Sequence, residues 1–444
     1  MARPTNKVTA IKGGRLIDGN GGRVVKDPVI VIKGDRIQAI GTAKDVKIPK
    51  NAEIVDARKH TLMPGMMDNH LHLCMFNCLT FKNYRVAQWE VTPELQQLYA
   101  LFHGQLCLDM GFTTLRDMGF LTSRGLVTNE MCAVRDAIDV GIFRGPRLVI
   151  GAFTVGTGSH LDLINPRAAQ RMGFVTADGP DELRKLARTN LLQGADVIKT
   201  CASGGGGTDK EEPGVRNHTP EELFAIADEA HMNHKKCAVH AFTPEAQRAA
   251  IDAGADTLEH IVFHTDEMIA EIAEKKIPIT PTLAHRTDHA IDIRRDMGTP
   301  RFILNKMKEI QPFCYESFQK YYEAGALIAM GTDMGYEPEM GQMAFELEVY
   351  VDLGMKPMHA IQTATKNAAI GLGLEDDLGT LEKGKIADIV VVDGDPSRNI
   401  KVLQDKKKIA MVFKDGEKMV DRRPGQNLNV VQMEMGSWVK LDDQ

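Results

Sequence analysis

The central part of the chain alternates short apolar runs with longer amphipathic stretches. Short apolar runs bounded by glycine or polar residues predict buried strands, and stretches with apolar residues at helical spacing predict helices. Strands that alternate with helices form parallel β/α units. Eight alternating units fit a closed barrel better than an open sheet. The eight candidate strands are residues 61–68, 112–116, 147–150, 196–199, 237–240, 257–260, 277–280 and 327–330.

The stretches between these runs carry explicit helix signals. Thr219, Pro220 and Glu222 form a capping box with proline at the first helical position, which predicts that a helix begins there. Pro244 predicts the start of the next helix, and Gly254 is well placed to end it. These signals support the alternation of strands and helices.

Both ends of the chain follow a different pattern. Apolar runs at residues 8–11, 29–32, 387–393 and 409–413 are separated by turns rich in Gly, Asn and Asp. Runs of this kind predict hairpins. We therefore expect an α/β protein with two domains. A (β/α)8 TIM barrel, residues 63–375, is inserted into a small β-sandwich domain formed by both termini, residues 1–62 and 376–444.

Composition narrows the classes of function. Of the 444 residues, 43% are hydrophobic and 26% are charged, as in an ordinary globular protein. The formal net charge of -6 provides no basic field for nucleic acid. No apolar stretch is long enough to span a bilayer, and none near the N-terminus has the pattern of a signal peptide. We expect a cytoplasmic protein that binds neither nucleic acid nor a membrane.

The seven cysteines do not suggest a disulfide framework, because their number is odd and several fall inside predicted strands or helices. Cys74 and Cys78 could form a thiolate clip for metal, but no second closely spaced pair completes a structural zinc site. Buried free thiols are the favoured interpretation.

Residues that can bind metal stand at the ends of several predicted strands. His70 and His72 flank Leu71, so both imidazoles point to the same side of their strand. Two further histidines, His240 and His260, end later runs, and Asp333 follows the last run. The carboxyl ends of barrel strands meet around one site, and imidazole and carboxylate suit zinc and other first-row metals. Surface or structural histidines remain the alternative for each residue taken alone.

Lys199 ends the fourth run and does not fit this group as an ordinary ammonium. An ammonium has no lone pair and would repel a dication. Its side chain either points to solvent, or forms a salt bridge, or is chemically modified within the site.

Taken together, these residues and their flanking motifs resemble the amidohydrolase superfamily over nearly the whole chain. Within it, Ile198-Lys199, Ser203-Gly204-Gly205, residues 219–222 and Ala230-His231 make the chain similar to the branch of imidazolonepropionase-like enzymes that includes zinc X-Pro dipeptidases. The motifs that carry the resemblance are residues 64–72, 111–117, 194–199, His240, Glu259-His260, Gly331-Thr332-Asp333 and residues 379–391.

The resemblance implies a barrel with a β-sandwich and a binuclear metal site in which Lys199 is carboxylated by CO2. A carbamate is anionic and has two oxygens, so it can bridge two dications. By this analogy His70, His72 and Asp333 hold one metal, His240 and His260 hold the second, and Lys199 bridges both. Zinc is the expected metal, with cobalt, manganese and iron left open. The implied chemistry is attack by a metal-bridging hydroxide, with Asp333 as the acid-base group.

Substrate residues are expected on the loops that follow the strands. His160 matches a histidine that faces the substrate in related dipeptidases, although Thr157 to Ser159 depart from the usual glycines. His218 stands where those dipeptidases have tyrosine, which puts a dipeptide substrate in doubt, and Arg216 could bind a carboxylate. Residues 204–207, four glycines, could cradle an anion or act as a hinge. His285 and His289 could line the mouth of the pocket.

The leading hypothesis is a metal-dependent hydrolase that cleaves an amide C–N bond in a small molecule, such as a dipeptide or an N-acyl amino acid. A hydrolase of carbamates, phenylureas or anilides is the alternative. A scaffold protein without catalysis is disfavoured, because all six ligand types are present. The resemblance also implies a homo-oligomer.

Overall fold

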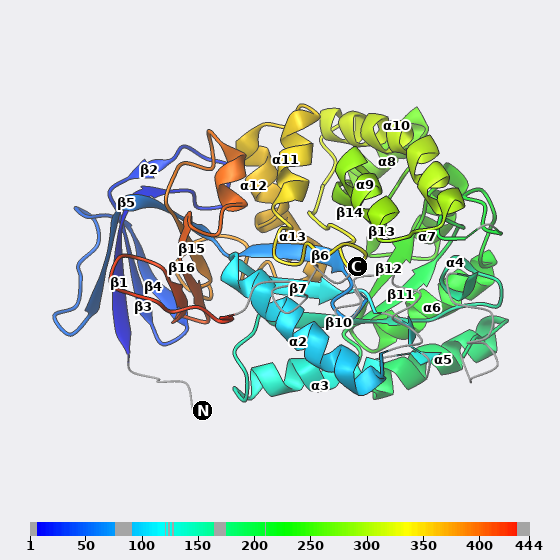
Figure 1. Cartoon of the computed structure of the whole chain (residues 1–444), viewed down its shortest axis with the longest axis horizontal. Helices are drawn as coiled ribbons and strands as arrows, with labels where there is room; N and C mark the ends of the chain where they lie inside the picture. Colours follow the sequence, from blue (N-terminus) through cyan, green and yellow to red (C-terminus); the bar gives the residue numbers. More distant parts are fainter. Residues whose placement is uncertain are drawn as a thin grey trace.

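The computed structural model describes residues 7–75, 91–119, 121–122, 125–126, 128–163, 175–208 and 210–432. A barrel wrapped by helices lies beside an all-β part built from the two ends of the chain (Figure 1). The predicted α/β fold, a TIM barrel with a β domain from both termini, is confirmed.

Seven parallel strands form the barrel sheet in chain order within the described residues. Residues 327–334 take the eighth position without forming a regular strand. Ile328 bridges to Ile279 on one side, and Met334 bridges to Leu71 on the other, so this segment closes the barrel. The strands are β6 (Met66–Leu71), β7 (Phe112–Asp117), β10 (Arg147–Phe153), β11 (Val197–Cys201), β12 (Lys236–His240), β13 (Thr257–Glu259) and β14 (Ile279–Thr280).

Helices surround the barrel, and threonine caps many of them. Thr219 and Glu222 form the predicted capping box at the start of α6, and Thr243 caps α7 ahead of Pro244. The helices are α2 (Pro93–Asp109), α3 (Thr128–Asp139), α4 (His160–Leu163), α5 (Pro180–Leu192), α6 (Pro220–Met232), α7 (Pro244–Asp252), α8 (Asp266–Lys275), α9 (Asp288–Asp296), α10 (Arg301–Glu323), α11 (Phe345–Asp352), α12 (Pro357–Thr363) and α13 (Lys366–Leu372). Short elements are β8 (Leu121–Thr122), β9 (Gly125–Leu126) and the 3-10 turns η2 (Ala284–Arg286) and η3 (Ile400–Leu403).

The two termini share one eight-stranded sheet. The sheet curls so that its β4 edge approaches the segment just before β15. There the amide of Ile37 donates a hydrogen bond of 2.9 Å to the carbonyl oxygen of Lys385. Apolar side chains such as Ile11, Ile30 and Phe413 fill the space enclosed in this way. The strands are β1 (Val8–Leu16), β2 (Val25–Lys26), β3 (Pro28–Lys33), β4 (Arg36–Thr42), β5 (Glu53–Pro64), β15 (Ile389–Val392), β16 (Ile409–Lys414) and β17 (Glu417–Asp421).

The terminal sheet is fixed to the amino-terminal end of the barrel. Val390 and Val412 belong to the same apolar core as barrel residues such as Phe112. Arg147, at the start of β10, lies 2.9 Å from Asp388 and 2.6 Å from Asp415 of the sheet. This attachment leaves the opposite end of the barrel, where the strands end, clear for the site.

Among the described residues, no helix is both long and apolar enough to cross a membrane. The cysteines that the structure describes are buried free thiols, as predicted, and Cys78 lies outside the described residues.

Candidate metal centre and substrate cavity

The six residues singled out from the sequence lie at the carboxyl ends of the barrel strands and line one cavity. His70 lies on β6 and His72 directly follows it, while Lys199 lies on β11. His240 ends β12 and His260 directly follows β13. The cavity is lined by His70, His72, Met75, Phe153, His160, Leu161, Lys199, His240, His260, Asp333 and Tyr336.

His70, His72 and Asp333 form a compact group, with one potential ligand atom from each within 4.8 Å of the others. Asp333 Oδ1 lies 3.1 Å from His72 Nε2 and 3.7 Å from His70 Nε2. Burial alone would raise the pKa of Asp333, but His285, His72, His70 and His260 hold it well below its usual range. An ionised carboxylate between two imidazoles is a set of donors that suits a divalent metal.

A buried ion pair holds His70 in position. The Nδ1 atom of His70 lies 2.7 Å from Glu259 Oε2, and Glu259 Oε1 accepts a hydrogen bond of 2.8 Å from Arg116. The carboxylate therefore fixes the Nδ1–H tautomer and leaves Nε2 with its lone pair toward the cavity, as carboxylates behind metal-binding histidines do. The sequence placed Glu259 in a motif but gave it no role.

His240 and His260 are held by weaker, neutral partners. His260 Nδ1 lies 2.7 Å from Thr282 Oγ1, and His240 Nε2 lies 3.1 Å from the carbonyl oxygen of Gly204. The rings of these two histidines are 4.8 Å apart, and the ring of His260 is 4.7 Å from that of His70. Burial lowers the pKa of both His240 and His260 well below the usual value. Both rings are therefore in the neutral form that binds metal at neutral pH.

Lys199 has an unusual environment for an amine. The residue is 2% exposed, and its Nζ atom has no hydrogen-bond partner among the described residues. Burial lowers its pKa to about 8, although Glu259 and Asp333 act in the opposite direction. A lysine with this pKa is about a tenth unprotonated at pH 7, far more than an exposed lysine, and only the neutral amine can react with CO2.

The backbone around the site is locally strained. His260, Ile261, Thr282 and Asp333 all have positive φ angles, between 32° and 74°, which non-glycine residues rarely adopt. Strain of this kind persists where surrounding structure enforces it, and it is common at functional sites. Gly331 shows the constraint, since a Cβ atom there would lie 2.3 Å from Thr280 Cγ2 and 2.9 Å from the backbone nitrogen of His70.

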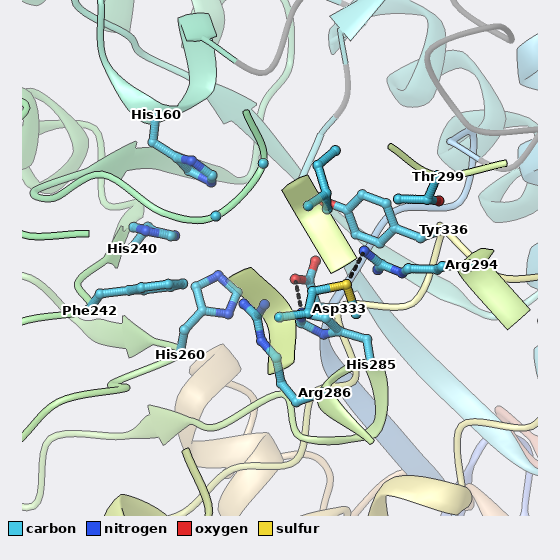
Figure 2. Close-up of a pocket in the computed structure, with 14 residues that line it drawn as sticks. His160, His240, Phe242, His260, His285, Arg286, Arg294, Thr299, Asp333 and Tyr336 are labelled. Carbon is cyan, nitrogen blue, oxygen red and sulfur yellow. Dashed lines mark hydrogen bonds and ion pairs between the residues drawn. The ribbon is translucent and has the colours of Figure 1, made fainter. Parts of the chain in front are cut away.

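His160 forms the edge of the cavity next to His240. Their rings stack with centroids 4.2 Å apart, and Phe242 stacks on the other face of His240 at 4.4 Å (Figure 2). His160 Nδ1 is hydrogen bonded to Glu211, which leaves Nε2 for a substrate. The glycine segment supports this pair, because the amides of Gly205 and Gly207 donate to Glu211 at 2.5 Å and 2.7 Å. These two N–H groups therefore hold a carboxylate of the chain itself.

A second compartment adjoins the metal ligands, and its two arginines, Arg286 and Arg294, were missed in the sequence. Arg286, Arg294 and Tyr336 line it together with His285, whose Nε2 lies 3.4 Å from Asp333 Oδ2 (Figure 2). His285 was predicted from the sequence at the mouth of the pocket. Arg286 directly follows His285, and this proximity was the one signal in the sequence that could have pointed to Arg286. His289 points elsewhere, to Glu339 at 2.8 Å.

Two predicted substrate residues lie outside both compartments. His218 is buried, with Nδ1 at 3.7 Å from Glu222 Oε2, and lines neither part of the cavity. Arg216 is exposed, and its backbone forms an isolated antiparallel β-bridge with Ser203. The structure thus brings His160 to the metal ligands and leaves His218 and Arg216 apart.

The comparison with family models agrees with this geometry. The model of the amidohydrolase family matches residues 61–419. The chain belongs to the amidohydrolase family. It is a hydrolase that acts on carbon–nitrogen bonds, as was predicted.

Known relatives cover almost the entire chain. Ochratoxinase from Aspergillus niger is 29% identical over 436 residues, which span 93% of this chain and 86% of the relative. A Xaa-Pro dipeptidase crystallised with methionine in its active site is 32% identical, with a TM-score of 0.82 over 93% of this chain and 99% of that one. Phenylurea hydrolase B, 24% identical with a TM-score of 0.77 over 96% and 100%, shares the fold.

Proposed function

We propose that this protein is a binuclear metal amidohydrolase that cleaves the amide bond of a small substrate such as a dipeptide or an N-acyl amino acid. The observation that carries the proposal is the buried Lys199 amine, which has no hydrogen-bond partner among the described residues and shares a cavity with five histidines and Asp333. The similarity to a Xaa-Pro dipeptidase and to ochratoxinase supports an amide substrate.

The donors in the cavity fit two divalent metals, with zinc the best match to imidazole and carboxylate ligands. His70, His72 and Asp333 would hold one ion, and His240 and His260 the other. The amine of Lys199 fits as a carbamate, because burial already favours its neutral form and a carbamate supplies the negative charge that the His240 side lacks. Bound metal would supply a nucleophile at neutral pH and would polarise the scissile carbonyl.

The side chains of the site provide the remaining chemistry. Asp333, ionised and in contact with His72 and His285, can take the proton of the attacking water and pass it to the leaving nitrogen. His160, whose Nδ1–H is held by Glu211, presents the lone pair of Nε2 to the cavity and can accept a hydrogen bond from an N–H group of the substrate. The enclosed cavity excludes most water from the substrate and strengthens both interactions.

The test combines metal analysis with a substrate panel. Purified protein is analysed for metal, then stripped and reloaded with zinc in buffer with bicarbonate or in CO2-free buffer. We expect about two metals per chain and full activity only with bicarbonate. Activity without CO2 and with one metal per chain would rule out the bridging carbamate.

The panel pairs dipeptides and N-acyl amino acids with phenylureas, carbamates and anilides. Faster turnover of the first group is expected. Preference for the second would replace the proposed substrate class, and no turnover of any amide by the metal-loaded protein would contradict catalysis altogether.

A further inference from the structure

Arg286 is a buried cation at the cavity wall, and its guanidinium forms no ion pair among the described residues. The residue is 7% exposed, and its guanidinium contacts the ring of Phe242, with Cζ 5.6 Å from the ring centroid. Figure 2 shows the side chain extending between His260 and Asp333. Buried charges in proteins are normally paired, so this guanidinium is suited to bind an anion that enters the cavity.

The neighbouring Arg294 differs in this respect. Its Nε atom donates to Glu337 Oε1 at 2.5 Å, and its guanidinium lies 4.1 Å from the ring centroid of Tyr336. Glu337 neutralises the charge of Arg294. The Nη2 atom of Arg294 has no hydrogen-bond partner among the described residues. Arg294 can therefore add a hydrogen bond to a bound anion, whereas Arg286 supplies the positive charge.

The main chain that carries Arg286 is rigidly held. The carboxylate of Glu346 accepts hydrogen bonds from the amides of Leu283 and Ala284 at 2.7 Å and 2.5 Å. Gln311 Nε2 donates to the carbonyl oxygen of Arg286 at 2.7 Å, and the Arg286 amide donates to Leu283 O at 2.9 Å. The 3-10 turn η2 thus presents the guanidinium from a fixed position, which favours tight and specific binding.

We propose that Arg286 is a specificity-determining residue that binds the free carboxylate of the substrate's amino acid portion. A planar guanidinium pairs with a carboxylate through two parallel hydrogen bonds. The adjoining wall contains Phe242, Ile303, Met307 and Tyr336, which would contact an apolar side chain of that amino acid. This inference rests on the proposed amidohydrolase function and narrows its substrates to acids with a free carboxylate.

The test compares a carboxylate substrate with its uncharged analogue. N-acetyl-L-phenylalanine and N-acetyl-L-phenylalaninamide are offered to the zinc-loaded wild type and to Arg286→Met, and acetate release is measured. The wild type should prefer the acid. In Arg286→Met, kcat/KM for the acid should fall about 100-fold, mainly through KM, because a buried charge pair is lost, while the value for the amide should fall far less. Arg286→Lys should recover part of the loss.

Arg295→Met is the matched control, since Arg295 lies on the same loop-helix segment but is 58% exposed and paired with Asp292. It should behave as the wild type on both compounds. An equal loss on acid and amide in Arg286→Met, or a wild type indifferent to the carboxylate, overturns the inference. If the methionine variant does not fold, the wild-type preference and the Arg286→Lys variant still decide the matter.

A binding measurement separates this inference from the proposed function. Calorimetry compares L-phenylalanine with L-phenylalaninamide on the wild type and the variants, without any turnover. Binding of the acid that depends on Arg286, without hydrolysis of any amide, would retain the inference and contradict the proposed function. Hydrolysis that ignores both the carboxylate and Arg286 would do the reverse.

Discussion

The two walls of the candidate metal centre are built on different principles. On one wall, His70, His72 and Asp333 lie within ligand distance of one another, and a buried carboxylate, Glu259, orients His70. On the other wall, His240 and His260 have only neutral hydrogen-bond partners, and the amine of Lys199 lies in the same cavity. The first wall has the donor set of a metal site as it stands, whereas the proposed site on the second wall would need Lys199 to be carboxylated.

The largest effect is expected from removing the Lys199 amine, on which the proposed second metal site depends. Lys199→Met retains the length and apolar character of the side chain but cannot be carboxylated. We expect activity to fall about 10³-fold or more, as for loss of a principal electrostatic group, and metal content to drop from two ions per chain toward one. Metal analysis and steady-state kinetics measure both.

Lys185→Met, on the exposed side of α5, is the matched control and should change neither quantity. Thermal stability should be unchanged or higher in Lys199→Met, because a buried amine without a hydrogen-bond partner among the described residues is removed. Two metals per chain and normal turnover in this variant would mean that both walls bind metal without Lys199.

The next prediction compares the residue that orients His70 on the first wall with the residue that orients His260 on the second. Glu259→Gln should weaken metal binding about 10- to 100-fold, since it removes the carboxylate behind His70. Thr282→Ala removes only a neutral hydrogen bond to His260 and should cost about 5-fold. Competition with a chelator gives both affinities.

Glu259→Gln also leaves Arg116 without its counter-charge, so unfolding free energy should fall by about 3 kcal/mol. Urea unfolding of the metal-free proteins checks this cost separately from metal affinity. Equal losses of metal affinity in the two variants would show that the walls are supported alike.

An effect of similar size, confined to turnover, should appear at the substrate edge of the second wall. Glu211→Gln removes the carboxylate that orients His160, while the amides of Gly205 and Gly207 lose part of their acceptor. We expect kcat to fall about 10- to 100-fold with metal content unchanged, as for a lost acid-base partner. Glu212→Gln, its exposed neighbour, is the control. Loss of metal in Glu211→Gln would instead make His160 part of the metal centre.

The barrel and the metal-binding residue types were predictable because both depend on local patterns. Strand-end histidines such as His240 follow apolar runs, and the carboxyl ends of parallel strands must converge. The terminal strands were predictable as strands, but the pairing of β5 with β15, which joins both ends of the chain, is not visible in either segment alone.

The substrate compartment was much less predictable. Arg286 and Arg294 lie on a turn and a helix whose apolar spacing carries no sign of a cavity. Their difference depends on one contact distant in sequence, that between Arg294 and Glu337. His218 was placed by analogy with a tyrosine, yet its side chain packs toward Glu222 rather than into the cavity. Loop side chains follow tertiary packing, which a single sequence does not reveal.

The last effect bears on stability alone and concerns the segment directly after His72, on the first wall, in acid. His103, on α2, is fully buried, and its Nδ1 atom lies 2.5 Å from the carbonyl oxygen of Leu73, directly after His72. Burial lowers its pKa from 6.5 to about 4, although that hydrogen bond acts in the opposite direction. The unfolded chain therefore binds a proton that the folded chain does not, and the stability present above pH 6.5 is lost as the pH falls toward 4.

This single histidine should cost about 2 kcal/mol of unfolding free energy between pH 7 and pH 5. In urea unfolding of the metal-free protein, His103→Gln should be less stable than the wild type at pH 7, where it loses the packed ring, but should lose less stability on acidification. His359→Gln, on the exposed surface of α12, should follow the wild-type curve. If His103→Gln loses as much stability as the wild type between these pH values, protonation of His103 does not limit the fold in acid. The His72 wall would then be as tolerant of acid as the rest of the barrel.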